Sequence, residues 1–280
     1  MNAKIQRLVL ASLLVALFAV WAVVVGAQPA ANTPVLATTI TPVFGDEDAK
    51  PLAMLTVFDP WNPVLSSDSP SFVAYETGQV IYRGGEADDK TRGYMTVTLD
   101  EDALAALLDE INVGAIAELQ DYYDLAPMTD QPIQTFTVRS DHGSLTDVGV
   151  YGSLGHDADV RAAAPAALVA AFDLMVNYSH EDAAPWTPEK IEVILWPWDT
   201  SGAVDWPAEW PQLDSPFAVQ RESVTSIYLD YAELDNLRAL MEDADALRLD
   251  GQTYALTTRI PFPHEVVWPT AGPMTTAEPK

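Results

Sequence analysis

The alternation of apolar and polar residues predicts β-strands over most of the central chain. Runs rich in β-branched and aromatic residues, which are typical of strands, occur at residues 71–75, 79–82, 94–99, 133–139, 145–151, 191–196, 226–229, 246–249 and 253–260. Glycine-containing turns at 76–78, 141–143 and 250–251 each separate two such runs. The pattern therefore predicts three β-hairpins.

Three other segments have the spacing of an amphipathic helix. After Asp100, leucines at 104, 107 and 108 and Ile111 fall on one helical face, and Asp100 is a favourable N-cap. Asp230 begins a segment with nearly the same spacing, and a third helix is predicted at about 165–178. Each of the first two is preceded by a strand and followed by a hairpin, which indicates an internal duplication. Any strand that enters a capped helix would also look like this.

Together these elements predict the fold class and the domain boundaries. The expected fold is α+β, a mostly antiparallel sheet with two to three packed helices, and it includes the duplicated strand-helix-hairpin unit if the repeat is real. The domain is placed at residues 52–268, with the two halves of the duplication at 70–152 and 186–265. Residues 28–51 read as a Pro/Thr-rich linker and residues 269–280 as a disordered tail.

The N-terminus is predicted to direct export. Lys4 and Arg7 precede an apolar run at 8–25 that ends at small residues, which are the features of a signal peptide. Val25 and Ala27 suit the −3 and −1 positions of a cleavage site, so the mature chain would start near Gln28. The run is longer than the usual signal core of about 7–15 residues, and retention of 1–27 as a membrane anchor is the alternative. The protein is expected to be secreted or held on the outer face of the cytoplasmic membrane.

Charge and cysteine content narrow the classes of partner and chemistry. The formal charge is −27, with 41 acidic against 14 basic residues. Nucleic acid is excluded because lysine and arginine must neutralise its phosphates, and contact with a membrane is expected only through the N-terminal segment. The chain has no cysteine, so disulfides, lipid attachment to a cysteine and thiolate chemistry are excluded.

The candidate ligand-binding residues are four tryptophans. Five of the eight tryptophans lie between residues 186 and 211, and Trp196, Trp198, Trp206 and Trp210 are the ones assigned to binding. Exposed indoles beside prolines can stack on sugar rings or on proline-rich peptides. The alternative interpretation is that these indoles are plugs that cover the core of the sheet.

No motif predicts a catalytic, cofactor or metal site. Asp141, His142 and Ser144 have the residue types of a hydrolytic triad, but they are adjacent in a predicted turn, whereas triad members come from distant segments. Acidic pairs such as Asp157 and Asp159 lack the glycine and glutamate of a calcium loop and are read as helix caps or solvated faces. Catalytic residues, cofactors and metals are therefore predicted as none.

The predicted function is a non-catalytic binding or structural domain of the cell envelope. Its expected partner is a protein, a peptide or a wall polysaccharide. The alternative is a secreted hydrolase that uses a pair of carboxylates, because 41 acidic residues make some suitable pair unavoidable.

The sequence also resembles a class of uncharacterised bacterial exported proteins and lipoproteins. The resemblance is in segments 71–75, 78–82, 97–100, 148–152 and 258–265, and it covers residues 65–265. It implies an α+β envelope or secreted domain and no active-site residue. The lipid-attachment cysteine of many such proteins is absent here, which leaves the manner of anchoring open.

Cleavage of the N-terminal segment is testable by mass. If the segment is a signal peptide, the intact mass of the exported protein will correspond to a chain that starts near Gln28. A full-length mass in the membrane fraction would instead identify an uncleaved anchor.

Overall fold

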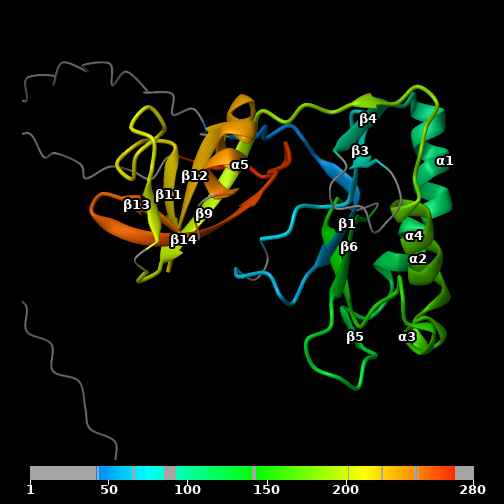
Figure 1. The fold of residues 1–280 in the computed structure, drawn as a ribbon. Helices are drawn as coiled ribbons and strands as arrows, with labels where there is room; N and C mark the ends of the chain where they lie inside the picture. Colours follow the sequence, from blue (N-terminus) through cyan, green and yellow to red (C-terminus); the bar gives the residue numbers. More distant parts are fainter. Residues whose placement is uncertain are drawn as a thin grey trace, which may run out of the picture. The chain divides into compact units, whose positions relative to one another are not determined.

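The predicted fold class is wrong, because the protein is mostly β. The computed structural model (Figure 1) describes residues 42, 44–64, 67–84, 93–140, 143–200, 202–221, 223–242, 244 and 246–268. Within them, 14 strands form two mixed sheets, and strand accounts for 37% of these residues against 21% for helix. The helices are therefore additions to a β structure and do not make up half of an α+β fold.

The first sheet has eight strands in the order β5-β7-β6-β1-β2-β3-β4-β8. Only β5 and β7 pair in parallel. The strands are β1 (Pro51–Phe58), β2 (Phe72–Tyr75), β3 (Gln79–Arg83), β4 (Tyr94–Thr98), β5 (Tyr122–Asp124), β6 (Ile133–Arg139), β7 (Leu145–Tyr151) and β8 (Ala184–Pro185). The helices that interrupt this part of the chain are α1 (Glu101–Ile111), α2 (Val113–Ala117), α3 (Ala158–Ala163) and α4 (Ala166–Val176).

The second sheet has six strands in the order β10-β13-β14-β9-β12-β11. Here β10 and β13 are the parallel pair. The elements are β9 (Lys190–Pro197), β10 (Ala203–Asp205), β11 (Ala218–Arg221), β12 (Val224–Asp230), the 3₁₀ helix η1 (Tyr231–Glu233), α5 (Leu234–Glu242), β13 (Ala246–Leu249) and β14 (Gln252–Arg259).

The strands that the sequence pattern missed account for the wrong class. Strands β5, β8 and β10 have two or three residues, too few to show alternation. The four-residue edge strand β11 also lies outside the predicted runs. Strand β1 begins at Pro51, which the composition assigned to the linker, yet β1 pairs with both β2 and β6 in the middle of its sheet. A proline is compatible with the first position of a strand. Because the segment that leads into β1 is rich in proline, the sequence pattern did not indicate this central strand.

Most of the predicted longer elements are confirmed, with one exception at a helix start. Asp100 caps α1, and its carboxylate accepts a hydrogen bond from the Ala103 amide at 2.8 Å. The predicted hairpins form at β2–β3, β6–β7 and β13–β14. Asp230, however, makes no side-chain cap. Its Oδ1 instead accepts a hydrogen bond from Lys190 Nζ at 2.5 Å.

The proposed internal duplication is also wrong. In the first sheet the β6–β7 hairpin joins the sheet through its first strand, since β6 pairs with β1. In the second sheet the β13–β14 hairpin joins through its second strand, since β14 pairs with β9. The strand that leads into the helix is next to the central strand only in the second sheet, where β12 pairs with β9. The two strand-helix-hairpin units therefore have different topologies.

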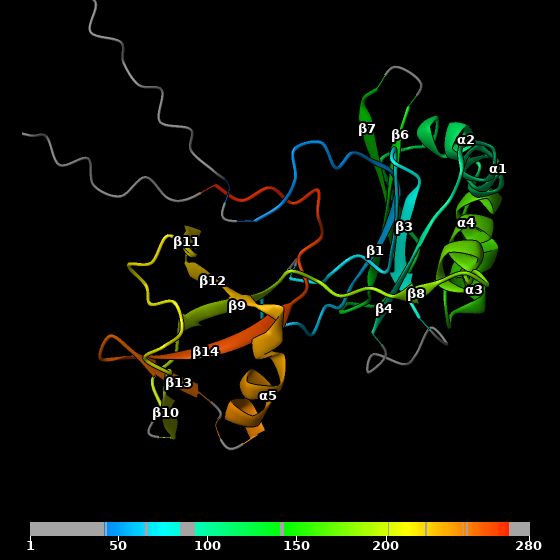
Figure 2. The same ribbon diagram turned by 90° about the horizontal axis from the view of Figure 1, so that it is seen from above.

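Both faces of the first sheet are covered at β2. Figure 2 shows α1 to α4 on one face, and all four residues of β2 are buried. Phe72 and Ala74 belong to the core under the helices, whereas Val73 and Tyr75 belong to a second cluster that also contains Phe262. A strand buried on both faces reads as a continuous apolar run, and the side chains of β2 fit that description.

The second sheet has one apolar face that packs against α5. Alternate residues of β9, Ile191, Val193 and Leu195, belong to this core together with Leu237 of α5. The period of two along β9 directs Glu192 and Ile194 to the opposite face of the sheet. A carboxylate is therefore placed on the face that α5 does not cover.

No helix among the residues that the structure describes is long and apolar enough to cross a membrane. The predicted export segment, residues 1–27, lies outside them, as do residues 28–41 and 43 of the predicted linker and the tail from residue 269.

Phe262 is expected to be the main apolar contact between the chain after β14 and the first sheet. Its ring is fully buried and lies 5.1 Å from the rings of both Tyr94 and Trp186. Phe262→Ala should lower the free energy of unfolding by about 3–5 kcal/mol, measured by chemical denaturation. The control Trp61→Ala removes an aromatic side chain that is 76% exposed and should change it by less than about 0.5 kcal/mol. Equal effects would contradict the assignment.

Candidate ligand-binding site

The four tryptophans assigned to binding do not form one exposed surface. Trp206 and Trp210 are only 5% and 7% exposed and belong to the core of the second sheet. Their rings pack edge to face at 5.0 Å. Trp196 is half-buried on β9, and only Trp198 is well exposed. The predicted stacking surface of four exposed tryptophans therefore does not exist in the structure.

Hydrogen bonds explain why the two buried indoles are accommodated. Trp206 Nε1 donates to the Pro211 carbonyl at 3.0 Å, and Trp210 Nε1 donates to Glu233 Oε2 at 3.1 Å. Buried indoles need such a partner for the N–H group. These two residues match the plug interpretation of the sequence.

The other motifs from the sequence have structural roles where they are described. Asp157 caps α3, because its carboxylate accepts hydrogen bonds from the amides of Asp159 and Val160. Ser144 Oγ lies 2.9 Å from Ser140 Oγ, while Asp141 and His142 lie outside the described residues. Across the described ranges, no three carboxylate or imidazole groups are close enough together to hold a metal ion.

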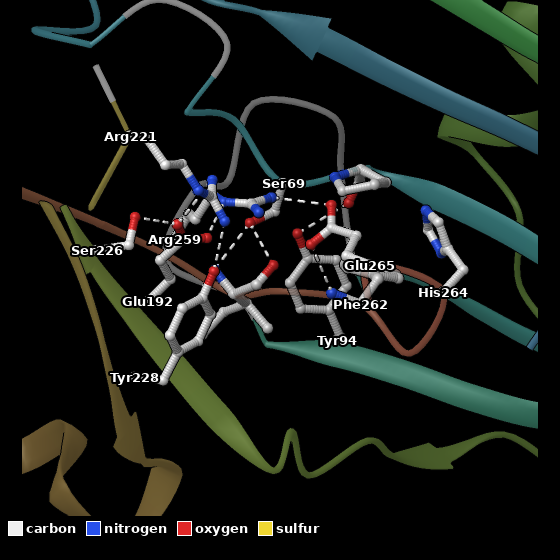
Figure 3. A network of polar contacts seen from close by, with 12 residues as sticks. Ser69, Tyr94, Glu192, Arg221, Ser226, Tyr228, Arg259, Phe262, His264 and Glu265 are labelled. Atoms are coloured by element: carbon white, nitrogen blue, oxygen red, sulfur yellow. Dashed lines mark hydrogen bonds and ion pairs between the residues drawn. The ribbon is translucent and has the colours of Figure 1, made fainter. Parts of the chain in front are cut away.

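A buried glutamate on β9 is the centre of an extended polar network (Figure 3). Glu192 is fully buried. The strand register places Tyr228 of β12 on one side of it and Arg259 of β14 on the other. Three adjacent strands of the second sheet therefore bring an acid, a phenol and a guanidinium together on the same face.

Both oxygens of the Glu192 carboxylate are satisfied. Arg259 Nε donates to Oε2 at 2.6 Å, and Ser226 Oγ donates to Oε1 at 2.5 Å. Arg221 Nη1 lies 3.2 Å from the same Oε1, and Arg221 Nη2 donates to the Tyr228 hydroxyl at 2.7 Å. A buried charge is tolerated when it is paired and hydrogen-bonded in this way.

The network continues to a second carboxylate. Arg259 Nη1 donates to Glu265 Oε1 at 2.9 Å, and the amide of Phe262 donates to Glu265 Oε2 at 3.0 Å. Burial alone would lower the pKa of Arg259, but Glu265 and Glu192 outweigh it and raise that pKa further above its usual range. Arg259 is therefore a permanent cation between two carboxylates.

Neutral groups join the network to the first sheet. Ser69 Oγ donates to the carbonyl of Ile260 and accepts from its amide, both at 2.8 Å. The Tyr75 hydroxyl lies 2.9 Å from His264 Nδ1. Burial lowers the pKa of His264, and nearby Arg259 lowers it further while Glu265 opposes the shift. Burial, and secondarily Glu265, raises the pKa of Tyr75, so the uncharged form of both rings is favoured.

A cavity of about 420 Å³ lies beside this network. Its polar wall consists of Thr56, Ser67, Asp68, Arg221, Ser226, Arg259 and Glu265. Its apolar wall consists of Met54, Phe58, Val64, Pro70, Ile194 and Val224. The volume is within the range of about 300–1,000 Å³ that is usual for small-molecule sites.

One hydroxyl in the cavity wall is unsatisfied. Ser67 is only 5% exposed, and its Oγ has no hydrogen-bond partner in the part of the chain that the structure describes. Most buried polar atoms in proteins are hydrogen-bonded, so each exception needs an explanation. A ligand atom in the cavity would supply the missing partner.

Sequence reasoning missed all of these residues. The segment 191–196 was read as a short apolar strand, and Glu192 within it was the available signal, because charged residues are almost never buried without a partner. The partners themselves, Arg221 and Arg259, are 29 and 67 positions away. No local pattern connects residues so far apart.

The buried pair of Glu192 and Arg259 should matter far more to stability than an exposed pair of the same geometry. Glu192→Gln removes the buried carboxylate that Arg259 and Arg221 share, so Glu265 alone remains to balance two guanidinium groups, and it should cost about 3–5 kcal/mol of unfolding free energy. In the control pair, Arg248 Nη1 and Asp205 Oδ1 are also 2.6 Å apart, but Asp205 is 79% exposed. Asp205→Asn should cost no more than about 1 kcal/mol. Similar losses in urea denaturation would refute a special role for the buried pair.

Comparison with known proteins assigns no chemistry to this cavity. Residues 71–175 match a family model described as a domain of unknown function (DUF6438). The match covers β2 to α4 and ends before Glu192, Arg221 and Arg259. No curated protein matches the chain. No solved structure matches it either.

Proposed function

We propose that this protein is an exported, non-catalytic binding domain of the cell envelope and that its ligand occupies the cavity beside Arg221 and Ser67. Export rests on the apolar segment 8–25 that follows Lys4 and Arg7. Binding rests on the cavity, which combines an apolar wall with a small number of polar groups. That combination is typical of small-molecule sites.

The unsatisfied hydroxyl of Ser67 is the observation that carries this proposal. Leaving a buried hydroxyl without a partner costs about 1–3 kcal/mol. A ligand that hydrogen-bonds to Ser67 Oγ recovers this energy on binding. The other serine of the wall, Ser226, already donates to Glu192, so Ser67 is the serine that is available to a ligand.

The network argues against the alternative, a hydrolase that uses two carboxylates. Such an enzyme needs one carboxyl group that holds a proton for the leaving group. Glu192 and Glu265 are instead hydrogen-bonded to the same guanidinium, and Glu265 also accepts from the Phe262 amide. Asp68 Oδ2 accepts from the Asp59 amide. The acids at the cavity are thus engaged as hydrogen-bond acceptors and are not positioned to deliver a proton.

The cavity also narrows the expected partner. A volume of about 420 Å³ suits a small molecule or one end of a peptide. A wall polysaccharide would stack on exposed tryptophans, but Trp206 and Trp210 are buried. The tryptophans therefore no longer favour a polysaccharide as the partner.

Filling the cavity should abolish binding. Val224 lines the cavity at the start of β12 and is only partly buried, so Val224→Trp adds bulk there with little effect on the core. A small-molecule fragment library, screened by ligand-observed NMR against the purified full chain, should give binders that lose at least about tenfold in affinity for Val224→Trp.

The matched control is Leu145→Trp, which adds the same indole at a residue of β7 that is 49% exposed. This variant should keep the affinity of the wild type. Fragments that bind Val224→Trp as well as the wild type, or a library without any binder, would rule out the cavity as the binding site.

A further inference from the structure

We propose that the cavity selects a small monocarboxylate with an apolar body, held by the guanidinium of Arg221 and the hydroxyl of Ser67. This inference rests on the proposed function and adds the class of ligand. It follows from the charge balance around Arg221, the geometry of its hydrogen bonds and the chemistry of the cavity wall.

The only acid paired with Arg221 among the described residues is Glu192, which is also paired with Arg259. The contact of Arg221 is with Glu192 Oε1 at 3.2 Å. That oxygen also accepts from Ser226, and the other oxygen of Glu192 is held by Arg259 at 2.6 Å. One buried carboxylate therefore serves two guanidinium groups. Arg259 has Glu265 as a second acid, whereas no second acid is paired with Arg221 among the described residues.

The other contact of Arg221 is with an uncharged group. Arg221 Nη2 donates to the hydroxyl of Tyr228. Burial raises the pKa of Tyr228, and the neighbouring Glu192 raises it further, so the phenol stays neutral. A neutral oxygen accepts a hydrogen bond from Arg221 but does not balance its charge. Arg221 consequently remains attractive to an anion.

Arg221 also has donors to offer. A guanidinium carries five N–H groups, and the contacts of Arg221 with Glu192 and Tyr228 engage only its two Nη atoms. Its side chain is 43% exposed, compared with 11% for Arg259. The planar fork of a guanidinium matches the two oxygens of a carboxylate. Arg221 is therefore the group in the cavity wall that can accept a new anion.

The surroundings limit that anion to a single negative charge. Asp68 and Glu265 line the same cavity, and the whole chain carries a formal charge of −27. A phosphate dianion would bring one more negative charge than Arg221 can balance. A cationic ligand would have to lie beside the two guanidinium groups of Arg221 and Arg259. A monocarboxylate brings only one negative charge to Arg221, so Asp68 and Glu265 repel it less than they would repel a dianion.

The remainder of the wall requires an apolar body. The side chains of Met54, Phe58, Val64, Ile194 and Val224 face the cavity. Each methylene group buried against such a wall strengthens binding by about fourfold. A short alkyl chain or one apolar amino-acid side chain satisfies this wall, while the carboxylate reaches Arg221.

Hexanoate is the probe for this ligand class. Isothermal titration calorimetry on the full chain should detect hexanoate binding that is at least about tenfold tighter than that of 1-hexanol, hexylammonium or propanoate. An N-acetylated dipeptide that ends in leucine tests a peptide C-terminus as the source of the carboxylate. Tighter binding of this dipeptide would place the ligand in a peptide, and tighter binding of hexanoate would indicate a free acid. Either result is consistent with the carboxylate class.

Two variants test the residues that hold the carboxylate. Arg221→Met keeps an unbranched stem of similar bulk to that of arginine but removes the guanidinium, and it should weaken hexanoate binding at least about tenfold. Arg221→Lys should restore only part of the affinity, because it keeps the charge but loses the fork. Ser67→Ala should weaken binding by about three- to tenfold. It removes an unpartnered hydroxyl, so this variant remains informative even if Arg221→Met does not fold.

The matched control is Arg248→Met. Arg248 is also an arginine of the second sheet, is 46% exposed and pairs with an acid, but it does not line the cavity. Its replacement should leave hexanoate affinity unchanged.

The outcomes separate the ligand class from the binding function. Hexanol or hexylammonium binding as tightly as hexanoate, or unchanged hexanoate affinity in both Arg221→Met and Ser67→Ala, would overturn the carboxylate assignment. So would a lack of hexanoate and dipeptide binding when library fragments bind in a Val224-dependent manner. In these cases the loss of fragment affinity in Val224→Trp alone decides whether the proposed binding function stands. If neither the probes nor any fragment binds, both proposals fail.

Discussion

The polar face of the second sheet depends on the burial of one carboxylate. Glu192 occupies the central strand of that sheet, and its charge cannot be buried without hydrogen-bonded counter-ions. Arg259 meets this requirement from the neighbouring strand. Because Arg259 also binds Glu265, the position of the chain after β14 is tied to the same charge. An apolar residue at position 192 could pack there, but it would not hold this network.

The ion pairs of Arg259 with Glu192 and Glu265 also affect the first sheet. The segment after β14 carries Phe262, which fills the cluster formed by Tyr75, Tyr94 and Trp186 on the face without helices. Ser69 binds both polar groups of Ile260, so backbone atoms of this segment are satisfied as well. One short stretch of chain thus completes the core of a sheet from which it is far removed in sequence. The aromatic cluster supplies buried area, and the ion pairs fix its position.

The candidate cavity follows from the same arrangement. Its apolar side comes largely from β1 and the residues that follow it, and its polar side includes Arg221, Ser226 and Arg259 of the second sheet. The network that stabilises the fold therefore also sets the electrostatics of the site. Arg259 is saturated by two carboxylates, whereas Arg221 shares one of them. This difference in paired carboxylates distinguishes Arg259, which has a structural role, from Arg221, which can take part in binding.

Local pattern predicted the longer elements well and the site not at all. The strands at 133–139, 145–151 and 246–249 were placed at their observed boundaries, and Asp100 was identified as a helix cap. These features depend on neighbouring residues, so the sequence carries them directly. Short edge strands lack enough residues for alternation, and β1 was concealed by Pro51. The pattern therefore predicts an α+β class for a protein that is mostly β.

The sequence by itself determined the charge, the absence of cysteine, the apolar run at residues 8–25 and the strands and helices with strong periodicity. Only the tertiary structure decided which of the many acidic residues is buried, which tryptophans are exposed and how each hairpin docks onto its sheet. The reason is that burial and ion pairing depend on pairing between distant strands. Glu192 and Arg259 are adjacent in the sheet but 67 residues apart in the chain, and their contact arises only when β9 and β14 pair in the observed register.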